Sequence, residues 1–230
     1  MSPAAVNMAN TQTTPLPPSI YEPQLIALAK AASAPEAKSV ADAICLQIKK
    51  TAQPLQAVLD ASIVDVVLLW ASSKSGYERE SAGVLVERLC KTLGEGVEGV
   101  FLPLLPALLN LMMDKGQPVR SAIQSAVNAL IKICPPESTR QVLEILGTTL
   151  NDVKGWRSKV AALKAMEGMV RPGEDGEWVA LEFGHIIPTV EHAMHDTKSE
   201  VRIVCFNKLT SGLLCCRQGR YRPLLHSPQR

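Results

Sequence analysis

The sequence is poor in aromatic residues and has almost no excess of one charge. Phe, Trp and Tyr make up 4% of its 230 residues, and the alternating Val, Ile, Thr and Tyr runs typical of strands are missing. Lys and Arg total 24 against 22 Asp and Glu, which gives a formal net charge of +2. This balance excludes a global attraction to nucleic acid or anionic membrane, so any such binding depends on local patches.

Long apolar runs, closely paired cysteines and a secretory signal are also missing. No stretch reaches about 18 consecutive apolar residues, so we expect no membrane span and no membrane partner. The six cysteines, at positions 45, 90, 134, 205, 215 and 216, form no CxxC pair. Without a secretory signal we expect them to be reduced in a cytoplasmic protein. Cys90 and Cys134 end amphipathic segments, where a thiol is typically a small buried hydrophobe.

The sequence contains no convincing catalytic, nucleotide or metal motif. "GEGVEG" at 94–99 fits GxGxxG, but it follows an amphipathic helix rather than a strand, and Glu95 and Glu98 would repel phosphate. His192 and His195 can share a helical face, but we expect no complete metal site around them. No serine or cysteine sits in a nucleophile elbow. We therefore predict a chain without enzymatic activity, cofactor, metal or small-molecule substrate.

What the sequence does contain is abundant Ala and Leu, which favours an all-α protein, and an internal repeat. "FLPLLPALLNLMMDKGQPVRSAI" and "GHIIPTVEHAMHDTKSEVRIVC" share an apolar helix with a proline, an Asp eight residues later, a short turn and Val-Arg. Asp114 and Asp196 are 82 residues apart, twice 41. A third copy, "VLEILGTTLNDVKGWRSKVAALKAMEGM", lies midway and carries Asp152, with Arg157 five residues later.

Two further copies upstream bring the count to about five helical hairpins, with boundaries near 53, 96, 136 and 178. A period of about 40 with two helices per unit predicts a HEAT/armadillo-type α-solenoid. We expect residues 22–205 to form this solenoid, after a disordered segment at 1–21. Residues 206–230 lose the repeat pattern, and we expect them to be a truncated or frame-shifted ending, helical at best to about 214.

The repeat suggests structural roles for two sets of residues. Second helices of neighbouring hairpins should stack, so Ala122, Ala126 and Ala129 let the backbones approach while larger residues fill the seam. The turn acids Asp114, Asp152 and Asp196 should accept backbone N–H groups at a helix start. The arginines Arg120, Arg157 and Arg202 should bridge to the Asp of the next turn, forming a ladder along the stack.

Charge is more informative locally than globally. Between 154 and 164 the chain carries Lys154, Arg157, Lys159 and Lys164 and no acidic residue. A basic helix start of this kind fits the phosphates of RNA, because turn-side Lys and Arg of a solenoid line one edge of its surface. A solvated helix face explains the same pattern without any ligand.

The stretch "LNDVKGWRSKVAALKAMEGMV" followed by "HIIPTVEHAMHDTKSEV" resembles the HEAT-repeat region at the N-terminus of fungal elongation factor 3 and its relatives among the ABC-F ATPases. The resemblance runs from about 22 to 205 and is strongest over 135–202, with Gly155 to Val160 as its most specific element. The translational regulator that activates the kinase of initiation factor 2α in starved cells has a similar stretch.

The resemblance implies a ribosome-bound translation factor whose HEAT arm touches the RNA and proteins of the small subunit. In that family ATP is hydrolysed by two cassettes further along the protein; this chain ends before either, so ATPase activity is not carried over. The residues we expect at the ribosome contact are Lys154, Trp156, Arg157, Lys159 and Lys198. The alternative is a protein–protein scaffold that grips helices in its concave groove, which the near-neutral net charge permits.

Overall fold

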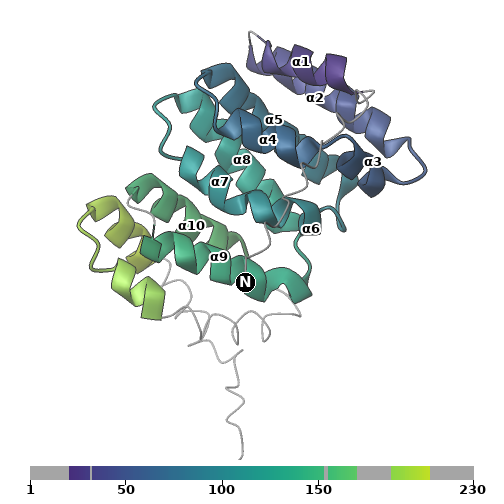
Figure 1. Ribbon diagram of the computed structural model, residues 1–230. Helices are drawn as coiled ribbons and strands as arrows, with labels where there is room; N and C mark the ends of the chain where they lie inside the picture. Colours follow the sequence, from purple (N-terminus) through teal and green to yellow (C-terminus); the bar gives the residue numbers. More distant parts are fainter. Residues whose placement is uncertain (1–20, 32, 153–154, 170–187, 208–230) are drawn as a thin grey trace, which may run out of the picture.

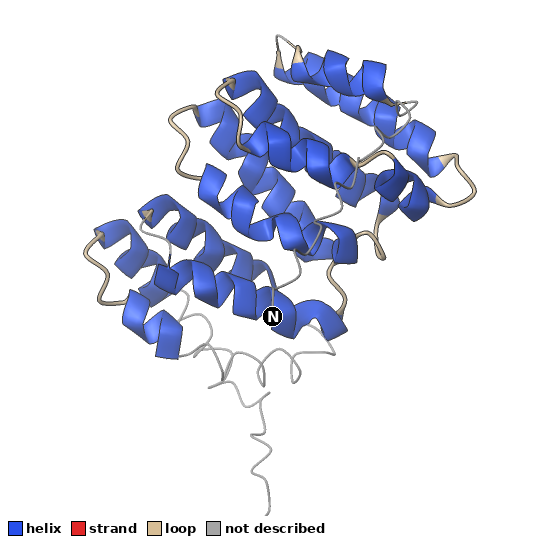
Figure 2. Cartoon of the chain, viewed as in Figure 1, coloured by secondary structure: helices blue, strands red, loops and turns tan. Residues whose placement is uncertain are grey.

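The computed structural model describes residues 21–31, 33–152, 155–169 and 188–207, and these residues form helices and turns without a strand (Figure 2). The elements are α1 (Glu22–Ala29), α2 (Ala34–Lys49), α3 (Pro54–Asp60), α4 (Ile63–Ala71), α5 (Gly76–Leu93), α6 (Glu98–Phe101), η1 (Leu102–Leu104), α7 (Leu105–Leu111), α8 (Gln117–Ile133), η2 (Pro136–Ser138), α9 (Thr139–Asp152) and α10 (Trp156–Met169). Two more helical segments cover 188–193 and 199–207. The prediction of an all-α protein is confirmed.

The helices form five antiparallel pairs that stack in one direction from α1–α2 to the segment 188–207 (Figure 1). Second helices contact one another in series, α2 with α5, α5 with α8 and α8 with α10, and so do the first helices α4, α7 and α9. Connections between pairs fall at 50–53, 94–97 and 134–135, close to the predicted 53, 96 and 136. The solenoid architecture is thereby confirmed.

Some predictions concern residues outside the part of the chain that the structure describes. The boundary near 178 lies outside the described residues, as do 1–20 and 208–230. Of the predicted atypical tail, residues 206 and 207 continue the helix that begins at 199. None of the described helices is by itself long and apolar enough to cross a membrane, although the bent pair α3–α4 passes that test by length and composition.

The first helices of two pairs are broken, whereas the second helices are continuous. Between α3 and α4 the chain turns at Ser62, whose φ of 49° is left-handed. Between α6 and α7 it passes through a 3₁₀ turn that starts next to Pro103, and Pro106 lies at the start of α7. Proline cannot donate the helical hydrogen bond, so it is tolerated only in a first turn. The second helices α5 and α8 run for 18 and 17 residues and provide the long stacking surfaces.

The helix starts define a common register for the repeats. In α2 and α5 the residue before the helix is a serine, Ser33 or Ser75, whose side chain accepts a backbone N–H of the first turn. Gly116 precedes α8, Gly155 precedes α10 and Lys198 precedes the helix at 199–207. We call these five residues the cap positions and count equivalent residues from them.

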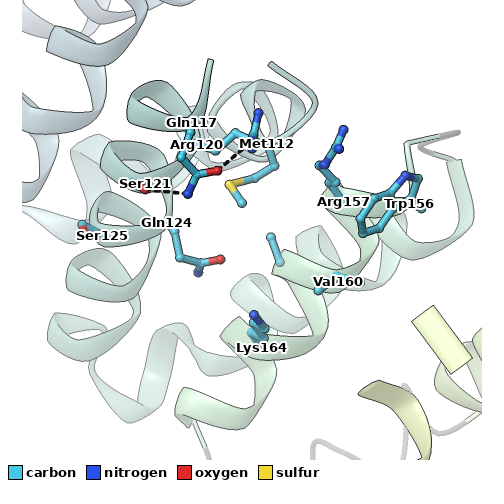
Figure 3. A pocket seen from close by; sticks show the side chains of 11 residues that line it. Met112, Gln117, Arg120, Ser121, Gln124, Ser125, Trp156, Arg157, Val160 and Lys164 are labelled. Atoms are coloured by element: carbon cyan, nitrogen blue, oxygen red, sulfur yellow. Dashed lines mark hydrogen bonds between the residues drawn. The ribbon is translucent and has the colours of Figure 1, made fainter. Parts of the chain in front are cut away.

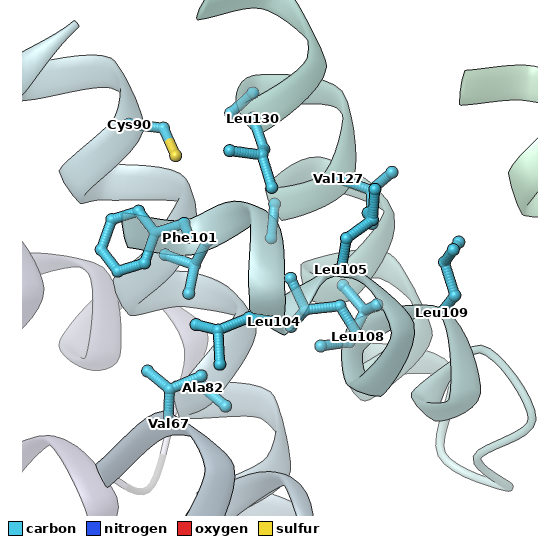
Figure 4. Close-up of a cluster of buried hydrophobic side chains, with 14 of the residues drawn as sticks. Val67, Ala82, Cys90, Phe101, Leu104, Leu105, Leu108, Leu109, Val127 and Leu130 are labelled. Carbon is cyan, nitrogen blue, oxygen red and sulfur yellow. The ribbon is translucent and has the colours of Figure 1, made fainter. Parts of the chain in front are cut away.

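The hydrophobic core runs through the stack and is contributed by both helices of each pair. In the third pair the first helices bury leucines and an aromatic ring that face α5 on one side and α8 on the other (Figure 4). The fully buried members of this layer include Phe101, Leu104, Leu105, Leu108, Val127 and Leu130. Burying them stabilises each seam by about 25 cal/mol per Å² of apolar surface removed from water.

Small residues sit where α5 and α8 approach most closely. A Cβ atom on Gly83 would lie 2.8 Å from the carbonyl carbon of Ala122 and 2.9 Å from the nitrogen of Ile123, so the backbones touch at this point. Ala126 is completely buried and Ala129 is 7% exposed. The prediction that small side chains in α8 permit close stacking is confirmed, and Gly83 supplies the opposing half of the contact.

Cys90 is fully buried, as predicted, and Cys45 is as well, whereas Cys134, predicted to be buried too, is only partly buried. Burial raises the pKa of the Cys45 and Cys90 thiols to about 12, so neither is a thiolate near neutral pH. We expect iodoacetamide at about pH 8 to leave both cysteines unlabelled in the native protein and to label them in urea, with peptide mass spectrometry as the measurement. Rapid native labelling of Cys90 would contradict the burial.

Candidate nucleic-acid interface

Two aspartates tie neighbouring pairs together along the edge of the turns. Asp114, two residues before its cap position, accepts the Gly116 N–H at 2.7 Å and forms an ion pair with Arg79 of the preceding pair. Asp196 repeats this arrangement by accepting the Lys198 N–H at 2.8 Å and the Lys159 Nζ at 2.8 Å. Each interaction links the first turn of one second helix to the turn of the next pair, so we call it a rung.

These carboxylates are held in their charged form. Burial alone would raise the pKa of Asp114, but the hydrogen bonds from Arg79 and Gly116, with the charges of Arg79 and Arg120, lower it below its usual value of 3.8. At Asp196 the effect of burial on the pKa is likewise outweighed, here by hydrogen bonds from Lys159 and Lys198 and by nearby charge. Both acids are therefore ionised at neutral pH and act as fixed structural acceptors.

The arginines four residues after the cap positions Ser75, Gly116 and Lys198 also brace their own turns. Arg79 donates from Nη1 to the Ser73 carbonyl at 2.7 Å. Arg120 donates from Nη1 to the carbonyls of Asp114 and Lys115 at 2.6 and 2.8 Å, and Arg202 donates likewise to those of Asp196 and Thr197 at 2.7 and 3.1 Å. Satisfying turn carbonyls in this way stabilises the reversal between the paired helices.

The predicted ladder needs two corrections, and its Asp152 member stays a prediction. Among the described residues, Arg120 and Arg202 pair with no acid of a following turn; both donate to carbonyls of their own turn. The residue equivalent to them in the fourth pair is Lys159 rather than Arg157, because α10 begins at Trp156. The side chain of Asp152 lies outside the described part of the structure. Counting five residues from Asp152 gives Arg157, but equivalent positions of the repeats are counted from the start of the second helix, and this count gives Lys159.

An open groove lies between α8 and α10. Its volume is about 490 Å³, and its described lining residues include the cations Arg120, Arg157 and Lys164 and no carboxylate. The other lining residues are Met112, Gln117, Ser121, Gln124, Ser125, Trp156, Val160 and Ala161. Arg120 lies on the α8 wall and Arg157 on the α10 wall, both near the turns, and Lys164 lies further along α10 (Figure 3).

The aromatic ring at the start of α10 supports one of these cations. The guanidinium of Arg157 lies over the Trp156 ring, 4.7 Å from its centroid, which is the geometry of a cation–π contact. A second hollow of about 350 Å³ follows between the same two helices and includes Asn128 and Gly168. The α8–α10 seam therefore forms a trough with polar amides on one wall and cations on both.

The structure separates the predicted contact residues. Trp156 and Arg157 line the groove, whereas Lys159 is engaged in its ion pair with Asp196, with side-chain exposures of 19% and 11%, so it is not open to a ligand. Lys198 is exposed at the next turn, and Lys154 lies outside the described residues. Two groove cations, Arg120 and Lys164, were not predicted as contacts. For Lys164 the sequence does hold a signal, because it follows Arg157 by seven residues and this spacing places both on one face of a helix.

Over the described residues, no group of three His, Cys, Asp or Glu side chains is arranged to hold a metal ion. This includes His192 and His195, which lie at the end of the fifth pair's first helix.

Comparison with known proteins identifies relatives along most of the chain. The family described as "EF3 N-terminal HEAT repeat" matches residues 37–204. The mRNA export factor elf1 of Schizosaccharomyces pombe is 34% identical over 145 residues, covering 61% of this chain and 14% of that protein. Elongation factor 3 of Gonapodya prolifera is 30% identical over 132 residues, covering 57% of this chain and 12% of its own length. The chain thus spans roughly one eighth of these relatives.

Among solved structures, one described as "TOG-tubulin binding specificity promotes microtubule dynamics and mitotic spindle formation" superposes with a TM-score of 0.55. The match covers 83% of this chain and 75% of that one at 16% identity. At this identity the likeness concerns the stacked helical-hairpin fold alone.

Proposed function

The chain belongs to the family of elongation factor 3 N-terminal HEAT repeats, and from this premise we propose that it is a ribosome-binding arm of an elongation factor 3-like protein. The arm docks on RNA, together with proteins of the small subunit, through the α8–α10 groove. It contributes binding rather than catalysis, and it acts in the cytoplasm. ATP hydrolysis, which the resemblance assigns to other domains of full-length family members, forms no part of the role proposed for these residues.

One observation carries the proposal: the groove has Arg120, Arg157, Lys164 and a tryptophan in its lining, and no carboxylate among the lining residues that the structure describes. The chain as a whole has a net charge of only +2, so this local excess is what a polyanion would meet. Lys and Arg bind phosphates, and an aromatic ring under a guanidinium keeps the cation oriented while leaving its edge free to donate.

The named relatives support a partner that contains RNA. Most carry the name elongation factor 3, and one is named as an mRNA export factor. Both names concern proteins that work with RNA or with the machinery that translates it. The surface that we propose to contact RNA belongs to the third and fourth helical pairs, which form the α8–α10 groove.

Salt-sensitive binding to ribosomes is the expected result for the purified chain in co-sedimentation. Three phosphate contacts at about 0.7 counterions each predict a roughly twentyfold loss of affinity between about 50 and 200 mM salt. Reversing the two α10 cations, Arg157→Glu with Lys164→Glu, should weaken binding by about tenfold or more, because two attractive contacts become repulsive.

The matched control reverses Lys49 and Lys50 to Glu, which are exposed at the far end of α2 and change the net charge equally. Its affinity should stay within about twofold of the parent, apart from general screening. If the α10 variant binds ribosomes as well as the parent does, the groove is not the contact. Salt-insensitive binding unaffected by either variant would favour the protein–protein scaffold instead.

A further inference from the structure

Two rungs of the turn edge are closed by carboxylates, whereas at the seam between them no rung is formed among the described residues. Arg79 uses Nε to reach Asp114 across one seam, while its Nη1 braces its own turn. Lys159 reaches Asp196 across another. Arg120 occupies the equivalent position between them and braces its own turn in the same way as Arg79.

The donor that Arg79 uses for its rung is unused in Arg120. Arg120 contacts its turn carbonyls through Nη1 and the Gln117 side chain through Nη2, and its Nε meets no acceptor among the described residues. In the sequence, the position two residues before the cap at Gly155 holds Val153, whereas Asp114 and Asp196 occupy this position in the flanking repeats. Val153 thus stands where the flanking repeats have the acid of the rung, and the acid of this turn, Asp152, comes one residue earlier in the sequence.

The open rung lies at the mouth of the groove and beside a second guanidinium. Arg120 is in the first turn of α8 and Arg157 in the first turn of α10, and both line the same hollow (Figure 3). A guanidinium prefers oxyanions that accept two parallel hydrogen bonds, such as carboxylate and phosphate. Because the Nε of Arg120 meets no acceptor among the described residues and the described lining residues include no acid, the position is suited to an anion from outside.

We propose that Arg120 and Arg157 together bind a phosphate group of an RNA strand, at the place where the neighbouring seams hold an aspartate. This inference rests on the proposed function and deepens it, because it assigns one phosphate to one residue pair. Lys164 lies seven residues, or about 10 Å, further along α10, where it meets a neighbouring phosphate of the same strand. The phosphates of the strand then follow Arg120, Arg157 and Lys164 along the groove.

Phosphate binding at this position also has a structural consequence. A carboxylate rung joins the second helix of one pair to the turn of the next, and a bound phosphate shared by Arg120 and Arg157 joins α8 to α10 in its place. A ligand that binds only the folded stack raises its stability by RT ln(1 + [L]/Kd), about 2.7 kcal/mol at a hundredfold excess over Kd.

The test compares two arginines that have the same structural role but different surroundings. Arg120→Gln and Arg202→Gln each remove hydrogen bonds to two carbonyls of the residue's own turn. Both should lower the melting temperature similarly, by the few degrees that about 1 kcal/mol produces. Arg202 lies outside the groove and close enough to Glu200 to interact with its charge, so it serves as the matched control.

Binding is measured with the full chain by fluorescence anisotropy of a labelled single-stranded oligouridylate. We expect Arg120→Gln to weaken binding by about five- to tenfold and to reduce the slope of log K against log salt by about 0.7, one phosphate contact. Arg202→Gln should bind within about twofold of the parent. Equal losses in the two variants, or full affinity in Arg120→Gln, would overturn the assignment.

Two further measurements distinguish a failure of the phosphate site from a failure of the proposed ribosome binding. Inorganic phosphate at about 10 mM, with ionic strength matched by chloride, should not displace the oligonucleotide from the parent protein. If phosphate does displace it from the parent but not from Arg120→Gln, the site binds free phosphate instead. Salt-sensitive ribosome binding that Arg120→Gln leaves intact overturns the phosphate site while leaving the ribosome-binding arm in place. Absence of binding to both ribosomes and the oligonucleotide overturns both.

Discussion

Replacing Gly83 by valine is expected to destabilise the protein by about 3 kcal/mol or more, the largest effect of any single substitution proposed for this chain. The added Cβ would stand 2.8 and 2.9 Å from backbone atoms of Ala122 and Ile123, which cannot rotate away as a side chain can. Relief requires α5 and α8 to separate along the most extensive seam of the stack. Urea denaturation followed by circular dichroism gives the change in unfolding free energy.

Alanine at Gly83 should cost about 1–2 kcal/mol, because overpacking outweighs the gain in helix propensity of up to about 1 kcal/mol. The matched control is Gly168→Ala in α10, where the new Cβ meets only the Cγ2 of Ile131 at 3.8 Å, an ordinary contact. That variant should be neutral or more stable by about 0.5 kcal/mol. If both alanine variants behave alike, close backbone packing at Gly83 is not what fixes the seam.

Removing the acid of a rung is expected to have the second-largest effect, with Asp114→Ala losing about 2–3 kcal/mol. The substitution deletes the acceptor of the Gly116 N–H and leaves Arg79 unpaired, at a site where the carboxylate is only 7% exposed. A double-mutant cycle with Arg79→Ala should give a coupling energy of about 1–2 kcal/mol. The exposed pair Arg140–Glu144, whose side chains are 69% and 65% exposed, should couple by no more than about 0.5 kcal/mol.

Replacing Asp114 by asparagine should also change how the stability of the protein depends on pH. The pKa of Asp114 is lower in the folded protein than its unfolded value of 3.8, so the contribution of the ionised carboxylate is complete above about pH 5. It is lost as the pH falls through 3.8 and then through the folded pKa. Thermal melts between about pH 6 and 3 should show a smaller decline for Asp114→Asn than for the parent. Parallel curves for the two proteins would mean that Asp114 does not contribute to the acid sensitivity.

The architecture could be predicted from the sequence because its evidence is local and repeated. Each hairpin carries its own helix periodicity, turn and cap, and the same spacing from Pro106 to Asp114 recurs from Pro188 to Asp196. A stack of such units buries a continuous core whatever the details of each seam. The alanines of α8 likewise indicate close packing without any knowledge of their partner.

The candidate interface could be predicted only in part. Trp156 and Arg157 are recognisable because they stand next to each other in a basic stretch at a helix start. Lys159 belongs to the same stretch, yet its Nζ is 2.8 Å from Asp196, 37 residues away, so the pattern alone predicts the wrong role for it. Arg120 was predicted to bridge to the acid of the next turn, but its Nη1 donates to the Asp114 carbonyl of its own turn. The choice between these partners depends on which residue lies across the seam, and that is not written in the stretch around Arg120.

By itself, the sequence determined the helical repeat, its period, the five hairpins and the family, since each of these depends on spacings within or between neighbouring segments. Only the tertiary structure decided which cation crosses which seam, that Gly83 faces Ala122, and that Arg120 and Arg157 share one groove. These contacts join residues about 40 positions apart, and they depend on how far each hairpin is rotated and shifted against the next. That offset is set by side-chain packing across the whole seam, which no short stretch of sequence records.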